Sequence, residues 1–309
     1  MSTTMASSKA TLQIYRGDKD GGDFKTYEVE TFPGMVVLDA IHEVQAKQAP
    51  DLAVRWNCKA GRCGSCSAEV NGKPRLMCMT RMTKYPEGEP IVVTPMRAFP
   101  IIKDLVTDVS FNYEMAKKIT PLKMKAPEAD GTWRMQQQDI ERVQEFRKCI
   151  ECFLCQDVCH VIRDHKKTNF AGPRFMIALA GLDMHPLDTL DRKKLIKDEF
   201  GVGMCNITRC CTEVCPESIN ITDNGIIPLK ERVADVHYDP VRWLLRKVSG
   251  GPTKTPAELP SQALRKVAPT ATNAPAPAAL PLPRSPSVSK QTMAATPVAK
   301  AKAKSETNE

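Results

Sequence analysis

Twelve cysteines constrain the fold of this 309-residue chain more than any other feature, because all of them fall into three short groups. The groups span residues 58–78, 149–159 and 205–215. Clustered thiols are typical either of a disulfide framework in a small secreted protein or of metal centres. Residues 1–10 lack the apolar core of a secretory signal peptide, so we expect a reducing compartment and thiolate ligands.

The first group has the spacing C-x4-C-x2-C followed by a distant fourth cysteine, which is the pattern of a plant-type ferredoxin loop. A two-iron cluster needs the chain to wrap closely around its sulfurs. Gly61 and Gly64 permit this because they lack a Cβ and can take positive φ. A structural zinc site is the alternative, but zinc sites usually space their cysteines as two C-x2-4-C pairs. The predicted [2Fe-2S] ligands are Cys58, Cys63, Cys66 and Cys78.

The second and third groups form a matched pair. The second has the spacing C-x2-C-x2-C-x3-C of bacterial-type ferredoxins, in which three cysteines hold one cluster and the fourth binds the other. The third group repeats the pattern, except that Thr208 replaces the second cysteine. The predicted [4Fe-4S] ligands are therefore Cys149, Cys152, Cys155 and Cys215. Three thiolates remain for the other centre, which predicts a [3Fe-4S] cluster on Cys159, Cys205 and Cys211.

Cys210 is left without a role in this scheme. It lies beside Cys211, and only one of the two can occupy the ligand position without changing the loop. The spacing favours Cys211, so we expect Cys210 to behave as a small buried apolar residue. A rearranged ligand set that uses Cys210 is the alternative.

The pattern of apolar and turn residues predicts two domains and an α+β fold. Strands are predicted at 11–15, 26–30, 67–70, 73–78 and 91–94, with a helix at 36–47. Further helices are predicted at 139–150, 173–181, 188–200 and 228–234. We expect a plant-type ferredoxin β-grasp domain at 10–112 and a helical bacterial-ferredoxin-type domain at 113–248. Residues 1–9 and the Ala-, Pro- and Lys-rich tail at 249–309 are predicted to be disordered.

Charge and hydropathy exclude two classes of function. The formal net charge is +8, but residues 249–309 hold eight basic and three acidic residues, so this tail carries +5 of it. The remainder is only mildly basic, which does not suggest a nucleic-acid partner. The longest purely apolar run, Met176–Ala180, is far below the roughly 18 residues that span a bilayer. We therefore expect no transmembrane segment in this chain.

With these three motifs in this order, residues 11–247 resemble the iron–sulfur subunit of bacterial succinate dehydrogenase and fumarate reductase. The resemblance implies a partner flavoprotein subunit that carries FAD and the dicarboxylate site, and a membrane anchor that carries quinone. It implies electron transfer from FAD through the [2Fe-2S], [4Fe-4S] and [3Fe-4S] clusters to quinone. It also implies a peripheral position on the cytoplasmic face of the bacterial inner membrane.

Some features of that family do not carry over. Relatives often have Pro, Trp and His at three positions near the last cluster, where this chain has His160, Asp164 and Asn206. We therefore assign no quinone-binding residues. Two alternatives to a succinate dehydrogenase subunit remain, a physiological fumarate reductase and the iron–sulfur subunit of another flavoprotein reductase. A stand-alone ferredoxin-like carrier is a third, although such carriers tend to be small and acidic.

Overall fold

The computed structural model of the chain describes residues 8–164 and 169–237, together with residues 240, 241, 244, 248, 255 and 256. The two segments predicted to be disordered, 1–9 and 249–309, lie outside these ranges apart from four residues. Those four are in strands: Ser8 and Lys9 begin β1, and Thr255 and Pro256 form β9. Disorder of the two segments stays a prediction.

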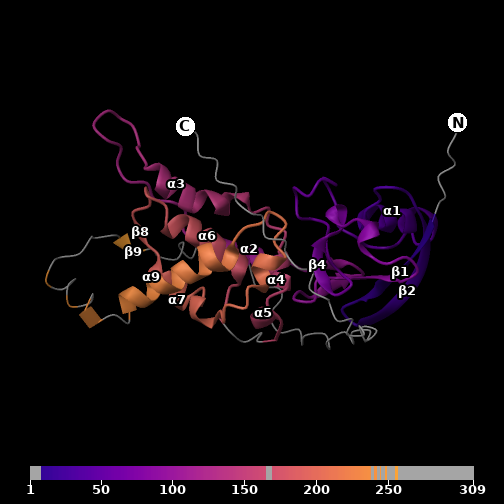
Figure 1. Cartoon of the computed structure of the whole chain (residues 1–309). Helices are drawn as coiled ribbons and strands as arrows, with labels where there is room; N and C mark the ends of the chain where they lie inside the picture. The colour runs from indigo at the N-terminus through magenta and orange to yellow at the C-terminus, as the bar shows by residue number, and fades with distance from the viewer. Residues whose placement is uncertain are drawn as a thin grey trace, which may run out of the picture. The chain divides into compact units, whose positions relative to one another are not determined.

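The N-terminal part is a mixed sheet that holds one helix, as the violet region of Figure 1 shows. Within the described residues its strand order is β4-β3-β5-β1-β6-β7, with β2 paired to the other side of β1. Strand β1 runs parallel to β5, and the other pairings are antiparallel. The strands are β1 (Ser8–Asp18), β2 (Gly21–Thr31), β3 (Ser67–Val70), β4 (Lys73–Leu76), β5 (Ile91–Thr94), β6 (Ile101–Lys103) and β7 (Val106–Thr107).

Helix α1 (Val37–Lys47) supplies the other half of this domain's core. Its buried residues Val37, Ile41 and Val44 recur at helical spacing and belong to the same apolar cluster as Leu12 and Val93 of the sheet. Removing these side chains from water is the main stabilising contribution of this layer. The predicted helix and the predicted sheet are therefore confirmed. The strand predicted at 73–78 is too long, because β4 ends at Leu76 and Met77–Met79 form a 3₁₀ turn that contains Cys78.

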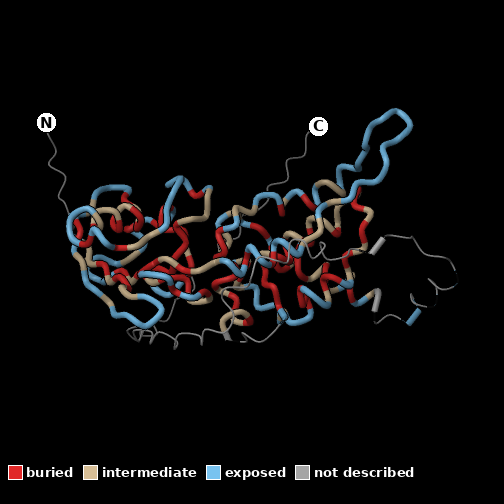
Figure 2. Tube along the Cα trace, turned by 180° about the vertical axis from the view of Figure 1, so that it is seen from behind, coloured by how far each residue is buried: buried red, intermediate tan, exposed pale blue. Residues whose placement is uncertain are grey.

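The second part is helical, with short elements between the cysteine groups. Its α-helices are α2 (Ser110–Lys117), α3 (Gln137–Gln144), α4 (Leu154–Asp157), α5 (His160–Asp164), α6 (Pro173–Asp183), α7 (Lys193–Asp198), α8 (Cys210–Glu213) and α9 (Ile227–His237). A π-helical turn, Ile221–Ile226, leads into α9. Helix α6 lies at the centre, with Phe175, Met176 and Leu179 fully or almost fully buried. The segment before α3 is instead exposed along nearly its whole length, as the pale blue loop in Figure 2 shows.

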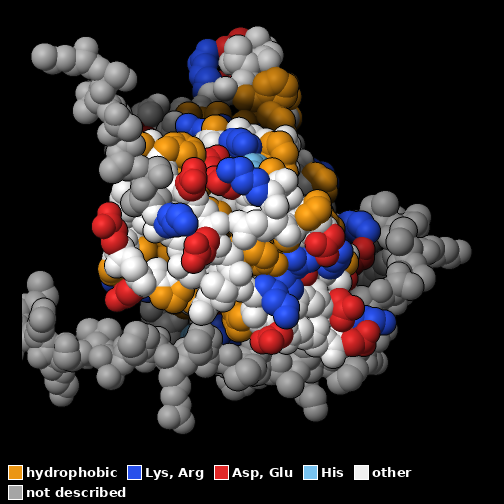
Figure 3. Space-filling model, turned by 90° about the vertical axis from the view of Figure 1, so that its right-hand side faces the viewer, with side chains coloured by type: hydrophobic (Ala, Val, Ile, Leu, Met, Phe, Trp, Pro, Cys, Tyr) orange, Lys and Arg blue, Asp and Glu red, His pale blue; other side chains and the backbone are white. Residues whose placement is uncertain are grey.

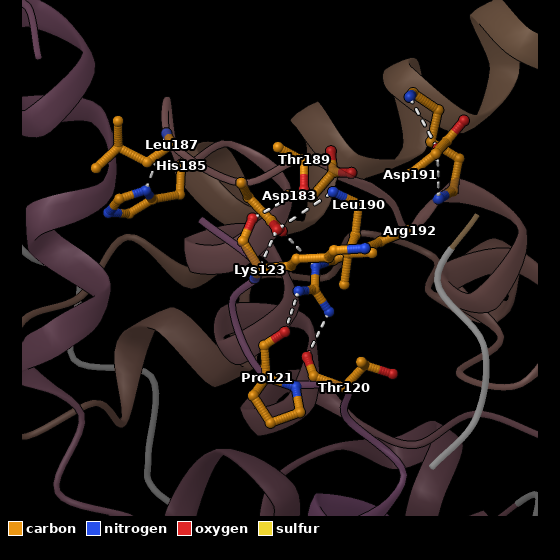
Figure 4. A network of polar contacts seen from close by, with 12 residues as sticks. Thr120, Pro121, Lys123, Asp183, His185, Leu187, Thr189, Leu190, Asp191 and Arg192 are labelled. Carbon is orange, nitrogen blue, oxygen red and sulfur yellow. Dashed lines mark hydrogen bonds and ion pairs between the residues drawn. The ribbon is translucent and has the colours of Figure 1, made fainter. Parts of the chain in front are cut away.

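The helix predicted at 188–200 is wrong over its first five residues. Leu190–Asp191 form strand β8, which pairs in parallel with β9 (Thr255–Pro256), and α7 starts only at Lys193. Arg192 is completely buried and pairs with Asp188 at 2.7 Å. Figure 4 shows its guanidinium donating to the carbonyl oxygens of Thr120 and Pro121, at 2.6 and 3.0 Å. These long-range partners hold the turn in a non-helical conformation.

Candidate iron–sulfur sites

Three cysteines of the first group, Cys58, Cys63 and Cys66, lie in a tight loop that precedes β3, and Cys78 lies in the 3₁₀ turn after β4. Gly61 and Gly64 have φ of +68° and +69°, as expected for a chain that wraps around a cluster. The backbone N–H groups of Ala60 and Arg62 point at the Sγ of Cys58, at 3.4 and 3.3 Å. Such N–H groups stabilise negative charge on sulfur, so this loop fits a thiolate-ligated two-iron cluster.

Burial and hydrogen bonds shift the pKa values of two of these thiols in opposite directions. Burial raises the pKa of Cys66 to about 12. Burial acts in the same direction on Cys63, but hydrogen bonds from Cys58 and Ser65 outweigh it and lower that pKa to about 6. A buried thiol with a raised pKa becomes a thiolate only when a cation replaces its proton, so loading this loop with iron releases protons.

The second and third cysteine groups adopt the same backbone conformation. Glu151 and Phe153 are left-handed, with φ of 57° and 61°, and Ile207 and Arg209 are left-handed with φ of 61° and 63°. In both groups the left-handed residues come two and four positions after the first cysteine. In each group a short helix begins directly after the second left-handed residue: α4 after Phe153 and α8 after Arg209. Non-glycine residues rarely take positive φ, so this coincidence identifies two copies of one motif.

The matched conformations determine which residues correspond. Cys211 corresponds to Cys155, because each is the second residue of its short helix and each is buried. Thr208 corresponds to Cys152, since each lies between the two left-handed residues. Cys210 corresponds to the buried Leu154. This register supports Cys211 over Cys210 as the predicted ligand and Thr208 as the position without a thiolate.

The fold brings the distant Cys215 to the second cysteine group. A small cavity of about 20 Å³ is lined by the four predicted [4Fe-4S] ligands, Cys149, Cys152, Cys155 and Cys215. Burial, followed by the negative charges of Cys149 and Cys215, raises the pKa of Cys152 to about 12. Four convergent thiols in an apolar surrounding are the donor set that a four-iron cluster requires.

The predicted ligands of the remaining centre are also neighbours. Burial, with contributions from the charges of Cys210 and Cys205, raises the pKa of Cys159 to about 11. Burial likewise raises the pKa of Cys211 to about 11, and the charges of Cys205 and Cys159 add to it. Within the described ranges, no three His, Cys, Asp or Glu side chains converge tightly enough to hold a single metal ion. A cluster differs from a single ion because each of its irons takes only one or two of the thiolates.

The two cysteine-bearing parts touch beside their predicted cluster ligands. A Cβ added at Gly64 would lie 2.6 Å from the Cα of Cys152, so the [2Fe-2S] loop packs directly on a predicted [4Fe-4S] ligand. The hydroxyl of Ser67 bridges this contact, at 2.8 Å from the carbonyl oxygens of both Gly64 and Cys152. Arg62 adds an ion pair to Glu217 at 3.7 Å. Sequence reasoning missed this contact, which carries no motif of its own.

A buried charge network lies at the same junction. Glu69 of β3 is almost completely buried and pairs with Arg97 at 2.7 Å and with Arg163 of α5 at 2.5 Å. Asp157 of α4 is completely buried and accepts from the backbone N–H of Ala98 at 3.0 Å. Burial, together with the nearby charge of Glu69, raises the pKa of Asp157 to about 7. These partners lie up to 94 residues apart in the sequence, so local sequence patterns do not predict the network.

Two residues that depart from the family pattern face each other beside the last centre. His160 follows Cys159, Asn206 follows Cys205, and their side chains meet at 2.7 Å between the Nε2 of His160 and the Nδ2 of Asn206. The Asn206 amide donates this hydrogen bond when Nε2 is unprotonated. The pair links the second cysteine group to the third on an exposed surface.

The fold and the three cysteine groups define an iron–sulfur electron-transfer protein. Residues 11–114 match a family described as a 2Fe-2S iron-sulfur cluster binding domain, and residues 145–219 match a 4Fe-4S dicluster domain. The fumarate reductase iron-sulfur subunit of Mycobacterium tuberculosis is 32% identical over 203 residues, which cover 64% of this chain and 81% of that protein. The succinate dehydrogenase iron-sulfur subunit of Bacillus subtilis is 28% identical over 236 residues, covering 70% and 90% respectively.

Further comparisons agree. A chain in the structure of the Mycobacterium smegmatis Sdh1 complex in the apo form is 64% identical, with a TM-score of 0.74, and the match covers 76% of this chain and all of that chain. An iron–sulfur protein of Methanococcus maripaludis is 33% identical, but this chain spans only 42% of its length. The chain belongs to the family of iron–sulfur subunits of succinate dehydrogenases and fumarate reductases.

Proposed function

We propose that this chain relays electrons between the flavin of a partner flavoprotein subunit and a quinone held by a membrane anchor, in the interconversion of succinate and fumarate. The observation that carries the proposal is the direct contact between Gly64 and Cys152, which joins the two cysteine-bearing parts into one continuous route. Bound clusters exchange one electron at a time, which connects two-electron flavin chemistry to quinone reduction.

Each part of the chain has a defined task in this relay. The loop that contains Cys58 and Cys63 holds the [2Fe-2S] cluster and receives electrons from the flavoprotein. The cavity lined by Cys155 and Cys215 holds the [4Fe-4S] cluster in the middle of the route. Cys159, Cys205 and Cys211 hold the [3Fe-4S] cluster at the quinone end. The buried thiols of Cys152 and Cys155 and the surrounding apolar side chains limit the access of water to the middle centre.

The chain itself is peripheral in this proposal. No helix among the described residues is long and apolar enough to cross a membrane. On the described part of the face drawn in Figure 3, basic and acidic side chains are interspersed. We place the subunit on the cytoplasmic face of the membrane, held there by its partners, and the support for this position is the family to which the chain belongs.

The decisive experiment is purification of the native complex through a tag on this chain. We expect a flavin-bearing subunit and a membrane subunit to co-purify, and succinate to reduce added quinone. Electron paramagnetic resonance should show a three-iron signal in the oxidised complex, and two-iron and four-iron signals after reduction. Co-purification with a flavoprotein that does not oxidise succinate would instead favour another flavoprotein reductase.

A further inference from the structure

Cys210 lies beside the position at which the third cysteine group lacks a thiolate. Thr208 takes the place that Cys152 has in the second group, and the Sγ of Cys210 is 3.3 Å from the Oγ1 of Thr208. In the second group the residue that corresponds to Cys210 is the apolar Leu154. The chain therefore has a thiol at an ordinarily apolar position, next to the missing ligand.

This thiol belongs to the group that surrounds the last centre. Cys210 directly precedes the predicted ligand Cys211 at the start of α8, and its sulfur contacts the side chain of Thr208. Thr208 is exposed and Cys210 is only partly buried, whereas Cys211 is buried. The side of the centre that lacks a thiolate is thus the side that solvent and dissolved ions can reach.

We propose that Cys210 is a conditional fourth ligand, which converts the three-iron cluster into a four-iron cluster when ferrous iron is available. Thr208 cannot take this role, because a hydroxyl is a poor ligand for iron that prefers thiolate. Cys210 is the first residue of α8, so a change of its χ1 rotamer redirects the sulfur without moving the backbone. The inference rests on the proposed ligand assignment at this centre.

The conversion balances in atoms and electrons. One electron from succinate, delivered along the relay, leaves the three-iron cluster with two ferric ions and one ferrous ion. A ferrous ion from solution then occupies the fourth corner and gives a cluster with two ferric and two ferrous ions. The Cys210 thiol loses its proton to solvent as the new iron–sulfur bond forms. Oxidation followed by loss of one ferrous ion reverses the step.

The conversion gives the terminal centre two states that depend on iron supply and reduction. The three-iron state needs only Cys159, Cys205 and Cys211, so it does not depend on Cys210. The four-iron state needs all four thiolates. Removing Cys210 should therefore abolish one state and leave the other unchanged, which separates this role from a purely structural one.

The test uses the whole complex, reduced with succinate and supplied with isotopically labelled ferrous iron. Mössbauer spectroscopy should detect labelled iron within a four-iron cluster at this centre, and the three-iron resonance should disappear. Cys210→Ala should keep the three-iron resonance and take up no label. Thr208→Val, which removes the neighbouring hydroxyl but keeps the thiol, should take up label like the unaltered complex.

Two results would overturn the proposal: no uptake by the unaltered complex, or equal uptake by Cys210→Ala. Neither result would touch the proposed function. That function fails on different evidence, namely the absence of a three-iron resonance in the untreated oxidised complex or the absence of succinate-dependent quinone reduction.

Discussion

Gly64 packs directly on the backbone of Cys152, which brings the predicted [2Fe-2S] loop against a predicted [4Fe-4S] ligand. A methyl group at residue 64 would stand 2.6 Å from the Cys152 Cα, a distance that real Cβ atoms essentially never show, and 3.0 Å from the Cys152 nitrogen, which is tighter than most real contacts. Because both obstructing atoms are backbone, they cannot rotate away. The separation of the two clusters therefore depends on the absence of a side chain at this position.

Gly64→Ala should increase the distance between the [2Fe-2S] and [4Fe-4S] clusters without removing either. We expect both reduced signals to remain while the magnetic coupling between them weakens, as measured by electron paramagnetic resonance of the dithionite-reduced complex. Gly72→Ala is the matched control, since Gly72 has a similar φ of +73° but nothing within 4 Å of the added Cβ. Weakened coupling in both variants would assign the effect to backbone strain.

Glu69→Ala should destabilise the junction between the two parts of the chain. The substitution leaves Arg97 and Arg163 without their shared carboxylate, and breaking a buried ion pair costs about 3 kcal/mol, at the low end because both arginines are partly exposed. Urea titration followed by loss of cluster absorbance measures the change. Lys117→Ala removes an exposed ion pair to Glu114 and should change stability by no more than about 0.5 kcal/mol. Equal effects of the two substitutions would contradict a stabilising role for Glu69.

Arg192→Ala should disturb the helical part more than the sheet part. Arg192 and Asp188 are both completely buried, so the substitution leaves an unpaired buried carboxylate and removes two donors from the Thr120 and Pro121 carbonyls. We expect the free energy of unfolding to fall by about 3–5 kcal/mol. On mild heating, the four-iron and three-iron signals should be lost before the two-iron signal. Lys193→Ala, next in sequence and more exposed, is the control and should retain all signals. If the Arg192 variant kept its cluster signals up to the same temperature as the Lys193 variant, the Arg192 network would not be a stabilising one.

Cys211→Ser and Cys210→Ser should behave differently in the oxidised complex. Cys211 corresponds to the predicted ligand Cys155, so its loss should abolish or convert the three-iron signal and stop electron flow to quinone. Cys210→Ser should keep both. If the two variants behaved the other way round, the register of α8 would be shifted by one residue.

Thr208→Cys should complete the third group as Cys152 completes the second. We expect a four-iron cluster without added iron and loss of the three-iron resonance, because four thiolates then surround the centre. Iron content should rise by one ion per chain, as determined by metal analysis. An unchanged three-iron resonance would show that residue 208 does not face the open corner.

The candidate cluster ligands could be predicted from the sequence, because the cysteines of each group lie close together in the chain. The spacing within 58–66, 149–159 and 205–215 is set by how short loops wrap a cluster, and the structure gives the second and third groups the same left-handed residues. The helix predicted at 188–200 was wrong over its first five residues, because contacts with distant residues determine the conformation there. Its first turn is held by Arg192 and partners near residue 120, which local periodicity does not contain.

Residue types at fixed short spacings were enough to predict the number and kinds of cluster, the α+β class and the family. How the cysteine-bearing parts pack on each other depends on tertiary contacts. The contact between Gly64 and Cys152 and the pairing of Glu69 with Arg163 involve residues about 90 positions apart. Such contacts form only when the two domains pack together. The physical reason is that these contacts are stabilised by burial of side chains and by desolvated ion pairs, and not by the local conformational preferences of the residues.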